Sequence, residues 1–207
     1  LVLARCASRD DVVFGSVLSG RMGGVAGADR MMGMFINTLP VRFTLKGVGV
    51  LEAMRAAQGV LVDLLKYEQT PLAVAQRCSG LDNAATLFSA MLNFRHSQES
   101  VNMLDRSGMV VVEARERTNY PFAVSVDDLG YEFALTAQTD VSVVVPERIL
   151  GYLGCAVLGI VEALEEEPGR GLKQLEVLPQ FEREQLIDGF NATQAEYPKE
   201  ALIHELF

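Results

Sequence analysis

The sequence contains few side chains that bind metal ions or accept protons near neutral pH. Its 207 residues include two histidines, three cysteines and no tryptophan. Neither His96 nor His204 has a histidine beside it, and the cysteines form no C-x-x-C pair. This spacing argues against a zinc ribbon and against a redox dithiol. We therefore expect buried free thiols at Cys6, Cys78 and Cys155, with no disulfide.

Positive charge and long apolar runs are also scarce. The chain has 18 Lys and Arg against 27 Asp and Glu, a net charge of -9. A polyanion would be repelled, and no basic stripe interleaved with aromatic residues offsets this average, so nucleic acid is not expected as a partner. No apolar run reaches the roughly 18 residues of a membrane-spanning helix. We expect a cytoplasmic protein that binds no membrane, and the absence of repeats and heptads excludes solenoids and coiled coils.

The pattern of apolar residues predicts an α/β chain. Helical spacing runs from residue 48 to 69, a short helix follows at 72–77, and a long helix begins at Pro146 and ends near Pro168. After a linker, 181–190 reads as a short amphipathic helix. Strands are predicted at 12–18, 87–94, 109–115, 122–126 and 132–139, with a hairpin turn at Asp-Asp-Leu-Gly between the last two.

The stretch 13–42 is where chemistry is most strongly indicated. A short apolar strand runs into a Ser-Gly-Arg bend and a glycine-rich turn, and the chain returns as a strand that contains an amide and a hydroxyl. Pro40 removes one ladder donor, so this second strand is expected to end or edge a sheet. The absence of G-x4-G-K-[ST] argues against a nucleotide site. The candidate site residues are Ser19, Gly20, Arg21, Asn37 and Thr38.

Several motifs follow one another in an order that resembles a known family. They are FGSVLSGR at 14–21, GMFINT at 33–38, LKYEQTPLAVA at 65–75, LFSAMLNFRHS at 87–97 and RTNYPFAVSVDDLG at 117–130. Together they resemble the C-terminal lobe of the condensation domains of nonribosomal peptide synthetases. The third motif is closer to H-Q-D-x-P-F-E in that family. The segment 190–207 is similar to the chain that leaves a condensation domain and enters an adenylation domain.

The resemblance implies a chloramphenicol acetyltransferase-like lobe, a mixed sheet covered by helices, as one half of a two-lobed domain. It assigns residues 1–167 to the lobe and 168–207 to a linker toward an adenylation domain. The family's catalytic motif, H-H-x-x-x-D-G, lies in the N-terminal lobe and has no match here. The first residues also read as the end of a helix already under way. We therefore expect half of an enzyme, with no catalytic residue of its own and no activity alone.

The implied reaction joins a donor aminoacyl or peptidyl thioester to the amine of an acceptor aminoacyl thioester, giving an amide. Both substrates are carried on the phosphopantetheine arms of carrier proteins, and no cofactor is bound directly. The implied partners are the N-terminal lobe, the donor and acceptor carrier proteins and a downstream adenylation domain. Attack on a thioester passes through a tetrahedral oxyanion, so the site needs hydrogen-bond donors and a proton acceptor.

Each candidate residue has a functional and a structural interpretation. The five are assigned to the substrate tunnel, with Ser19 facing the reacting atoms, although a serine before glycine also forms turns. Arg21 cannot be a base and either holds the opposite lobe, stabilises negative charge or forms a structural ion pair. Asn37 and Thr38 bond a crossing backbone or a pantetheine amide, or simply cap a strand.

Other classes of function stay open. Epimerisation and heterocyclisation lobes share the fold, and a noncatalytic module could dock carrier proteins or brace an adenylation domain. A free-standing acyltransferase would need His96 as its base, yet no carboxylate near it in the sequence orients it, which favours a surface histidine. Asp127 and Asp128 point to opposite faces of a strand and suit a turn, so no metal is assigned.

Overall fold

The computed structural model describes residues 1–22, 27–82, 85–96, 108, 112, 116–140, 142–195 and 204. It divides the chain into two compact units, Leu1–Val177 and Leu178–Phe207. The second unit contains the short helix α6 (Gln180–Glu184), which continues as one π-helical turn, η3 (Gln185–Gly189). These two elements coincide with the amphipathic helix predicted at 181–190.

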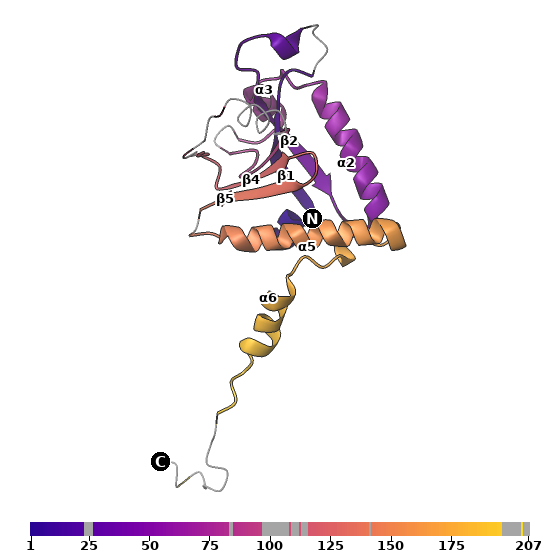
Figure 1. Ribbon diagram of the computed structural model, residues 1–207, viewed down its shortest axis with the longest axis vertical. Coiled ribbons are helices and arrows are strands. Elements are labelled where there is room, and N and C mark those ends of the chain that lie inside the picture. Colours follow the sequence, from indigo (N-terminus) through magenta and orange to yellow (C-terminus); the bar gives the residue numbers. More distant parts are fainter. Residues whose placement is uncertain are drawn as a thin grey trace. The chain divides into compact units, whose positions relative to one another are not determined.

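The first unit is an α/β fold, as the sequence pattern predicts, and its sheet is mixed and accompanied by helices, as the family resemblance implies (Figure 1). Its helices are α1 (Val2–Ala7), α2 (Val50–Leu65), α3 (Leu72–Cys78) and α5 (Pro146–Glu166), with 3-10 turns η1 (Ala28–Arg30) and η2 (Leu172–Gln174). Its strands are β1 (Asp11–Leu18), β2 (Asn37–Thr44), β3 (Ala90–His96), β4 (Phe122–Asp128) and β5 (Phe133–Thr139). Residues 109–115, predicted as a further strand, lie largely outside the described part.

The sheet has the order β2-β1-β3-β4-β5. The two outer pairs, β1–β2 and β4–β5, are antiparallel, whereas β1–β3 and β3–β4 are parallel. Pro40 lies on β2, where it pairs with Gly15 of β1. Because β2 is the first strand in the sheet order, the predicted edge position of the strand that contains Pro40 is confirmed. The hairpin turn between β4 and β5 is confirmed as well, with the amide of Leu129 donating to the carbonyl of Glu132.

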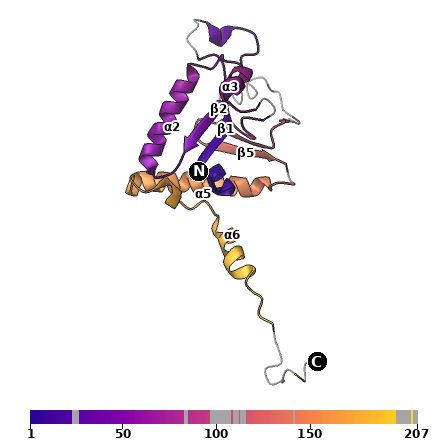
Figure 2. The same ribbon diagram turned by 180° about the vertical axis from the view of Figure 1, so that it is seen from behind.

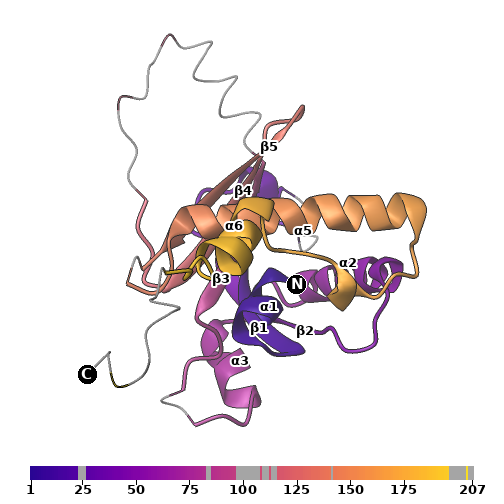
Figure 3. The ribbon, with the colours of Figure 1, turned by 90° about the horizontal axis from the view of Figure 1, so that it is seen from below.

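The core lies where both ends of the first unit meet. Its buried residues come from α1, β1, the residue after β2, the start of α2, the end of α5, and η2 with the residue after it: Ala4, Val12, Leu45, Val50, Ala163, Leu172 and Leu175. Figures 1 and 2 show α5 crossing below the sheet and α2 standing beside β2, and Figure 3 shows α1 near α5. The helices therefore cover the face of β1 that carries Val12, and Leu18 at the C-terminal end of β1 is buried as well, while Ser19, the next residue, is exposed.

Two expectations about single residues need correction. Cys6 and Cys78 are exposed and Cys155 is half-buried, so the expected burial of the thiols is wrong for the first two. Cys78 ends the short helix α3, whose seven residues have no buried position. No helix in the described part of the chain combines the length and apolarity needed to cross a bilayer.

Candidate functional site

The candidate residues meet at one end of the β1–β2 hairpin. Leu18 pairs with Asn37 and Val17 with Thr38, so the Ser-Gly-Arg bend that follows β1 lies next to the start of β2. The sequence separates these two groups by 16 residues or more, and the antiparallel register closes that gap. Ser19 is exposed, while Asn37 and Thr38 are half-buried. The site is therefore formed by two strand ends and is open to solvent.

Gly20 is required by its backbone and by its surroundings. Its φ of 69° lies in the left-handed region, and a Cβ atom placed on it would lie 1.8 Å from the carbonyl oxygen of Phe35. The side-chain amide of Gln69 donates a hydrogen bond to the carbonyl of Gly20. The bend thus contacts two other segments, one at Phe35 and one at Gln69, and only glycine fits against the carbonyl of Phe35.

Ser19 has the geometry of a turn residue with a solvent-facing hydroxyl. The backbone amide of Arg21 donates to its Oγ at 3.4 Å, a long hydrogen bond that uses one acceptor position. The hydroxyl keeps its proton for donation and a second lone pair for acceptance. Both interpretations from the sequence are therefore compatible with the position of Ser19.

Arg21 organises the loop that leads to β2. Its guanidinium donates to the carbonyls of Ala28, Met31 and Gly33 at 2.5, 2.6 and 3.2 Å and lies 4.4 Å from the ring centroid of Phe35. These partners are carbonyl oxygens, not the carboxylate of the expected ion pair. A planar fork with five donors suits such a cluster of carbonyls, and lysine would not replace it.

Asn37 ties β2 to the turn that follows α2. Its side-chain amide donates to the carbonyls of Glu68 and Thr70 at 2.9 and 2.7 Å, and its Oδ1 accepts from the amide of Thr38 at 2.9 Å. Of the two partners expected for this amide, the structure therefore supplies the crossing backbone. Thr38 packs below Gly15, where a Cβ on the glycine would lie 2.8 Å from the threonine methyl group.

Glu68 is a residue of this region that sequence reasoning did not single out. It is 2% exposed, and neither carboxylate oxygen has a hydrogen-bond partner among the described residues. Carboxylates are rarely buried unless they are paired or hydrogen-bonded. A signal was present in the sequence, because Glu68 stands where the resembled motif, H-Q-D-x-P-F-E, has its glutamine.

Two further pairs join β3 to β4 at the same end of the sheet. Arg95 and His96 are neighbours on β3, and each faces the residue in register with it on β4, Asp127 and Asp128 respectively. Neighbours on a strand point to opposite faces, so the two aspartates are separated as predicted. Asp128 also accepts from the amide of Gly130 at 2.9 Å, as expected of a turn.

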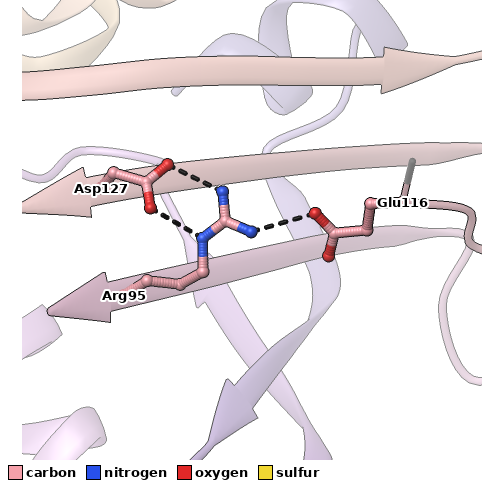
Figure 4. Close-up of polar contacts among 3 residues, drawn as sticks. All are labelled: Arg95, Glu116 and Asp127. Carbon is pink, nitrogen blue, oxygen red and sulfur yellow. Dashed lines mark hydrogen bonds and ion pairs between the residues drawn. The ribbon is translucent and has the colours of Figure 1, made fainter. Parts of the chain in front are cut away.

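Arg95 lies between two carboxylates (Figure 4). Its Nε and Nη2 donate to Asp127 at 2.8 and 2.7 Å, and its Nη1 donates to Glu116 at 2.9 Å. These hydrogen bonds, above all those to Asp127, raise the pKa of Arg95 above its ordinary value. The guanidinium therefore stays charged and acts as a cross-strand brace.

His96 is exposed but not without an orienting group. Its Nδ1 lies 3.2 Å from Oδ2 of Asp128, and its ring stands edge-on to Phe94 at a centroid distance of 5.1 Å. When Nδ1 carries the proton, Nε2 faces solvent as an acceptor. The carboxylate that the local sequence lacks is supplied by a strand 32 positions away.

Comparisons with known proteins add a family assignment to this geometry. The model of the family described as Condensation domain matches residues 1–187. The chain is 40% identical over 207 residues to malpibaldin synthetase of Mortierella alpina and 30% identical over 214 residues to bacitracin synthase 3 of Bacillus licheniformis. Both alignments cover 100% of the chain, but they span only 4% and 3% of those relatives.

Solved structures agree on the fold. The condensation domain of the monacolin K polyketide synthase MokA superposes with a TM-score of 0.62 at 22% identity, covering 83% of this chain and 40% of that one. A four-domain nonribosomal peptide synthetase bound to AMP and glycine gives a TM-score of 0.67 at 10% identity, over 88% of this chain and 15% of that one. At these identities the likeness establishes the fold alone.

Proposed function

The chain belongs to the condensation-domain family, and from this premise we propose that it is the C-terminal lobe of a two-lobed domain that forms amide bonds. Support comes from the comparison with the solved condensation domain of MokA. The match covers 40% of that domain's chain, so the remainder is long enough to form a second lobe. The boundary with a linker toward an adenylation domain, near residue 168, is part of the same proposal, as is a cytoplasmic location.

The proposed reaction is attack of an acceptor amine on a donor thioester. The nitrogen–carbonyl bond forms, the carbon–sulfur bond breaks, the thiolate leaves on the donor arm, and one proton is lost from the amine. We propose that both substrates arrive on phosphopantetheine arms of carrier proteins. The chain contains no H-H-x-x-x-D-G motif to take the proton, so the lobe on its own is proposed to be inactive.

The observation that carries the proposal is the junction of the ends of β1 and β2, where the FGSVLSGR and GMFINT motifs meet and Ser19 is exposed. Within it Ser19 is the residue proposed to face the reacting atoms, because it is exposed and its hydroxyl accepts one hydrogen bond while donating to no acceptor among the described residues. The bend after β1 and the start of β2 are proposed to form one side of the substrate tunnel. Gly20, Arg21 and Asn37 are proposed to hold these two segments in place, since their polar groups form hydrogen bonds to neighbouring segments. Thr38 lies beside them on β2.

The test is dipeptide formation between two loaded carrier proteins, followed by mass spectrometry of the product. The two-lobed domain is expected to form the amide, its Ser19→Ala variant to form it about 10-fold more slowly or worse, as for loss of a transition-state contact, and the isolated chain not at all. Ser142→Ala, an exposed serine far along the chain, serves as the control. Amide formation by the isolated chain would contradict the proposal that it is one half of a site.

A second candidate function is favoured by the pair His96–Asp128. A histidine oriented by a carboxylate has the arrangement of a general base, so a free-standing acyltransferase is the alternative that this contact supports. If the isolated chain transfers an acyl group and His96→Ala abolishes the transfer, this alternative replaces the first. If His96→Ala in the two-lobed domain leaves amide formation unchanged, the pair has no part in the chemistry.

A further inference from the structure

The segment between the two halves of the site exposes an unusual amount of apolar side chain. Four of the six residues 31–36 are large, apolar and solvent-facing: Met31 at 46%, Met32 at 99%, Met34 at 101% and Ile36 at 76% exposure. We call these four the methionine strip. Isolated exposed apolar residues are normal in soluble proteins, but a contiguous group indicates a surface that something covers.

The methionine strip is held in shape by the lobe itself. The guanidinium of Arg21 donates hydrogen bonds to the carbonyls of Met31 and Gly33 and stacks on the ring of Phe35. The carbonyl of Phe35 in turn lies directly against Gly20. Phe35 is thus turned toward the lobe, while its neighbours Met34 and Ile36 are turned outward. A loop fixed at this many points presents its apolar side chains as a preformed surface.

The position of the methionine strip limits what can cover it. The strip ends at Ile36, directly before the first residue of β2, and Figures 1 and 2 show its segment at the end of the hairpin where β1 ends. A proton acceptor must come within about 2.6–3.2 Å of the attacking amine, and the five candidate residues of the site include no side chain suited to that task. The body that supplies the acceptor must therefore approach this same end of the sheet.

We infer that the methionine strip is the docking surface for the second lobe of the domain, and that Arg21 is the positioning residue that shapes it. The inference rests on the proposed function. The second lobe is the occupant that the family match implies, because the chain covers only 40% of a solved condensation domain. Methionine side chains are flexible and polarisable, which suits an interface that must close against an independently folded surface.

Hydroxyl-radical footprinting with mass spectrometry tests the inference on the native side chains. Oxidation of Met32 and Met34 is compared between the chain alone and the same chain within the two-lobed domain, with Leu158 of α5, 71% exposed, as the internal control. Because methionine oxidation follows exposure, we expect the rate to fall about fivefold or more within the two-lobed domain and to stay constant at Leu158. Equal rates at Met32 and Met34 in both proteins would overturn the inference.

Two other occupants give different results, and both would overturn it. Protection that increases with the concentration of the isolated chain would identify a second copy as the occupant. Protection that appears in the two-lobed domain only after loaded carrier protein is added would identify the substrate side. Dipeptide formation is measured on the same sample, so a domain that protects the strip without forming an amide supports the docking surface and contradicts the proposed reaction.

Variants separate docking from folding. In the two-lobed domain, the double change Met32→Glu and Met34→Glu is expected to abolish protection of Met31 and Met22, while circular dichroism of the isolated chain stays unchanged. Arg21→Ala is expected to reduce the protection of Met32 and Met34 without adding charge, and Arg21→Lys is expected not to restore it. The matched control is Arg42→Ala, an exposed arginine paired with Asp11 at the other end of the hairpin. Unchanged protection in both the double variant and Arg21→Ala would contradict the inference.

Discussion

Glu68 illustrates how one side chain can work against the stability of the fold. Its carboxyl oxygens are buried without a donor among the described residues, and burying polar atoms that lack hydrogen-bond partners is costly. At the same time its backbone is in use, because its carbonyl accepts from Asn37. The backbone of Glu68 therefore has to remain in place, while its side-chain oxygens have no donor in the part of the chain that the structure describes.

We predict that Glu68→Gln raises the free energy of unfolding at pH 7. A neutral amide of the same shape is cheaper to bury than a carboxylate without donors, so the gain should be about 1–2 kcal/mol. Urea unfolding followed by circular dichroism measures it, because the chain has no tryptophan. Glu176→Gln, at an exposed position, should change stability by less than about 0.5 kcal/mol. A loss of stability in Glu68→Gln would mean that the carboxylate has a favourable partner.

Gly20 sets a second limit at the residue scale. We predict that Gly20→Ala destabilises the protein by more than the roughly 1–2 kcal/mol of the left-handed backbone alone, because the methyl group would also meet the carbonyl of Phe35. Gly47→Ala is the matched control: its φ is 72°, but no atom lies within 4 Å of the added carbon. An equal decrease in the free energy of unfolding of the two variants would show that the segment at Phe35 moves aside at no energetic cost, and it would contradict the prediction.

At the scale of elements, the turn after α2 is attached to β2 chiefly through one side chain. We predict that Asn37→Ala costs about 2–3 kcal/mol, since three hydrogen bonds of about 1 kcal/mol each are lost, at Glu68, at Thr70 and at the amide of Thr38. Amide hydrogen exchange in residues 66–70 should accelerate in the same variant. Asn191→Ala removes an asparagine that bonds carbonyls within the second unit, and it should leave the exchange in 66–70 unaltered.

The elements themselves were predictable from the sequence, because each depends on neighbours in the chain. The predicted helix 48–69 is realised as Val50–Leu65, the strand 122–126 as Phe122–Asp128, and Pro146 begins α5 as expected. What the sequence did not supply is the pairing between elements. His96 meets Asp128 because β3 and β4 run parallel in register, and no local pattern encodes that register.

The proximity of the candidate residues was predictable from the sequence, but their contacts were predictable only in part. The glycine-rich bend and the Asn-Thr strand were recognised as one region, and the register of β1 with β2 brings them together. A crossing backbone was among the partners expected for Asn37, and the structure supplies it. The carbonyl partners of Arg21 were not expected, because backbone groups leave no trace in the identity of a residue. The burial of Glu68 depends likewise on the packing of several elements. The assignment of these residues to a substrate tunnel stays a prediction.

At the scale of the first unit, the fold is closed by segments from its two ends. Leu172 and Leu175 join Ala4 and Val12 in the core, and Arg5 of α1 donates to the carbonyls of Lys173 and Leu175 at 2.7 and 3.1 Å. These contacts span about 170 positions of sequence. Such non-local pairing makes the unit cooperative, because neither terminal segment can bury its apolar residues alone.

We therefore predict that Leu175→Ala destabilises the first unit by about 2–5 kcal/mol, the range for a large-to-small change in a packed core. Leu175 is 1% exposed and Leu158 is 71% exposed, so Leu158→Ala is the matched control with an expected loss below about 0.5 kcal/mol. Urea unfolding of both variants gives the difference, and an unchanged slope with urea would show that the unit still unfolds as a whole. Equal stability of the two variants would mean that residues 172–175 pack on the sheet without completing its core.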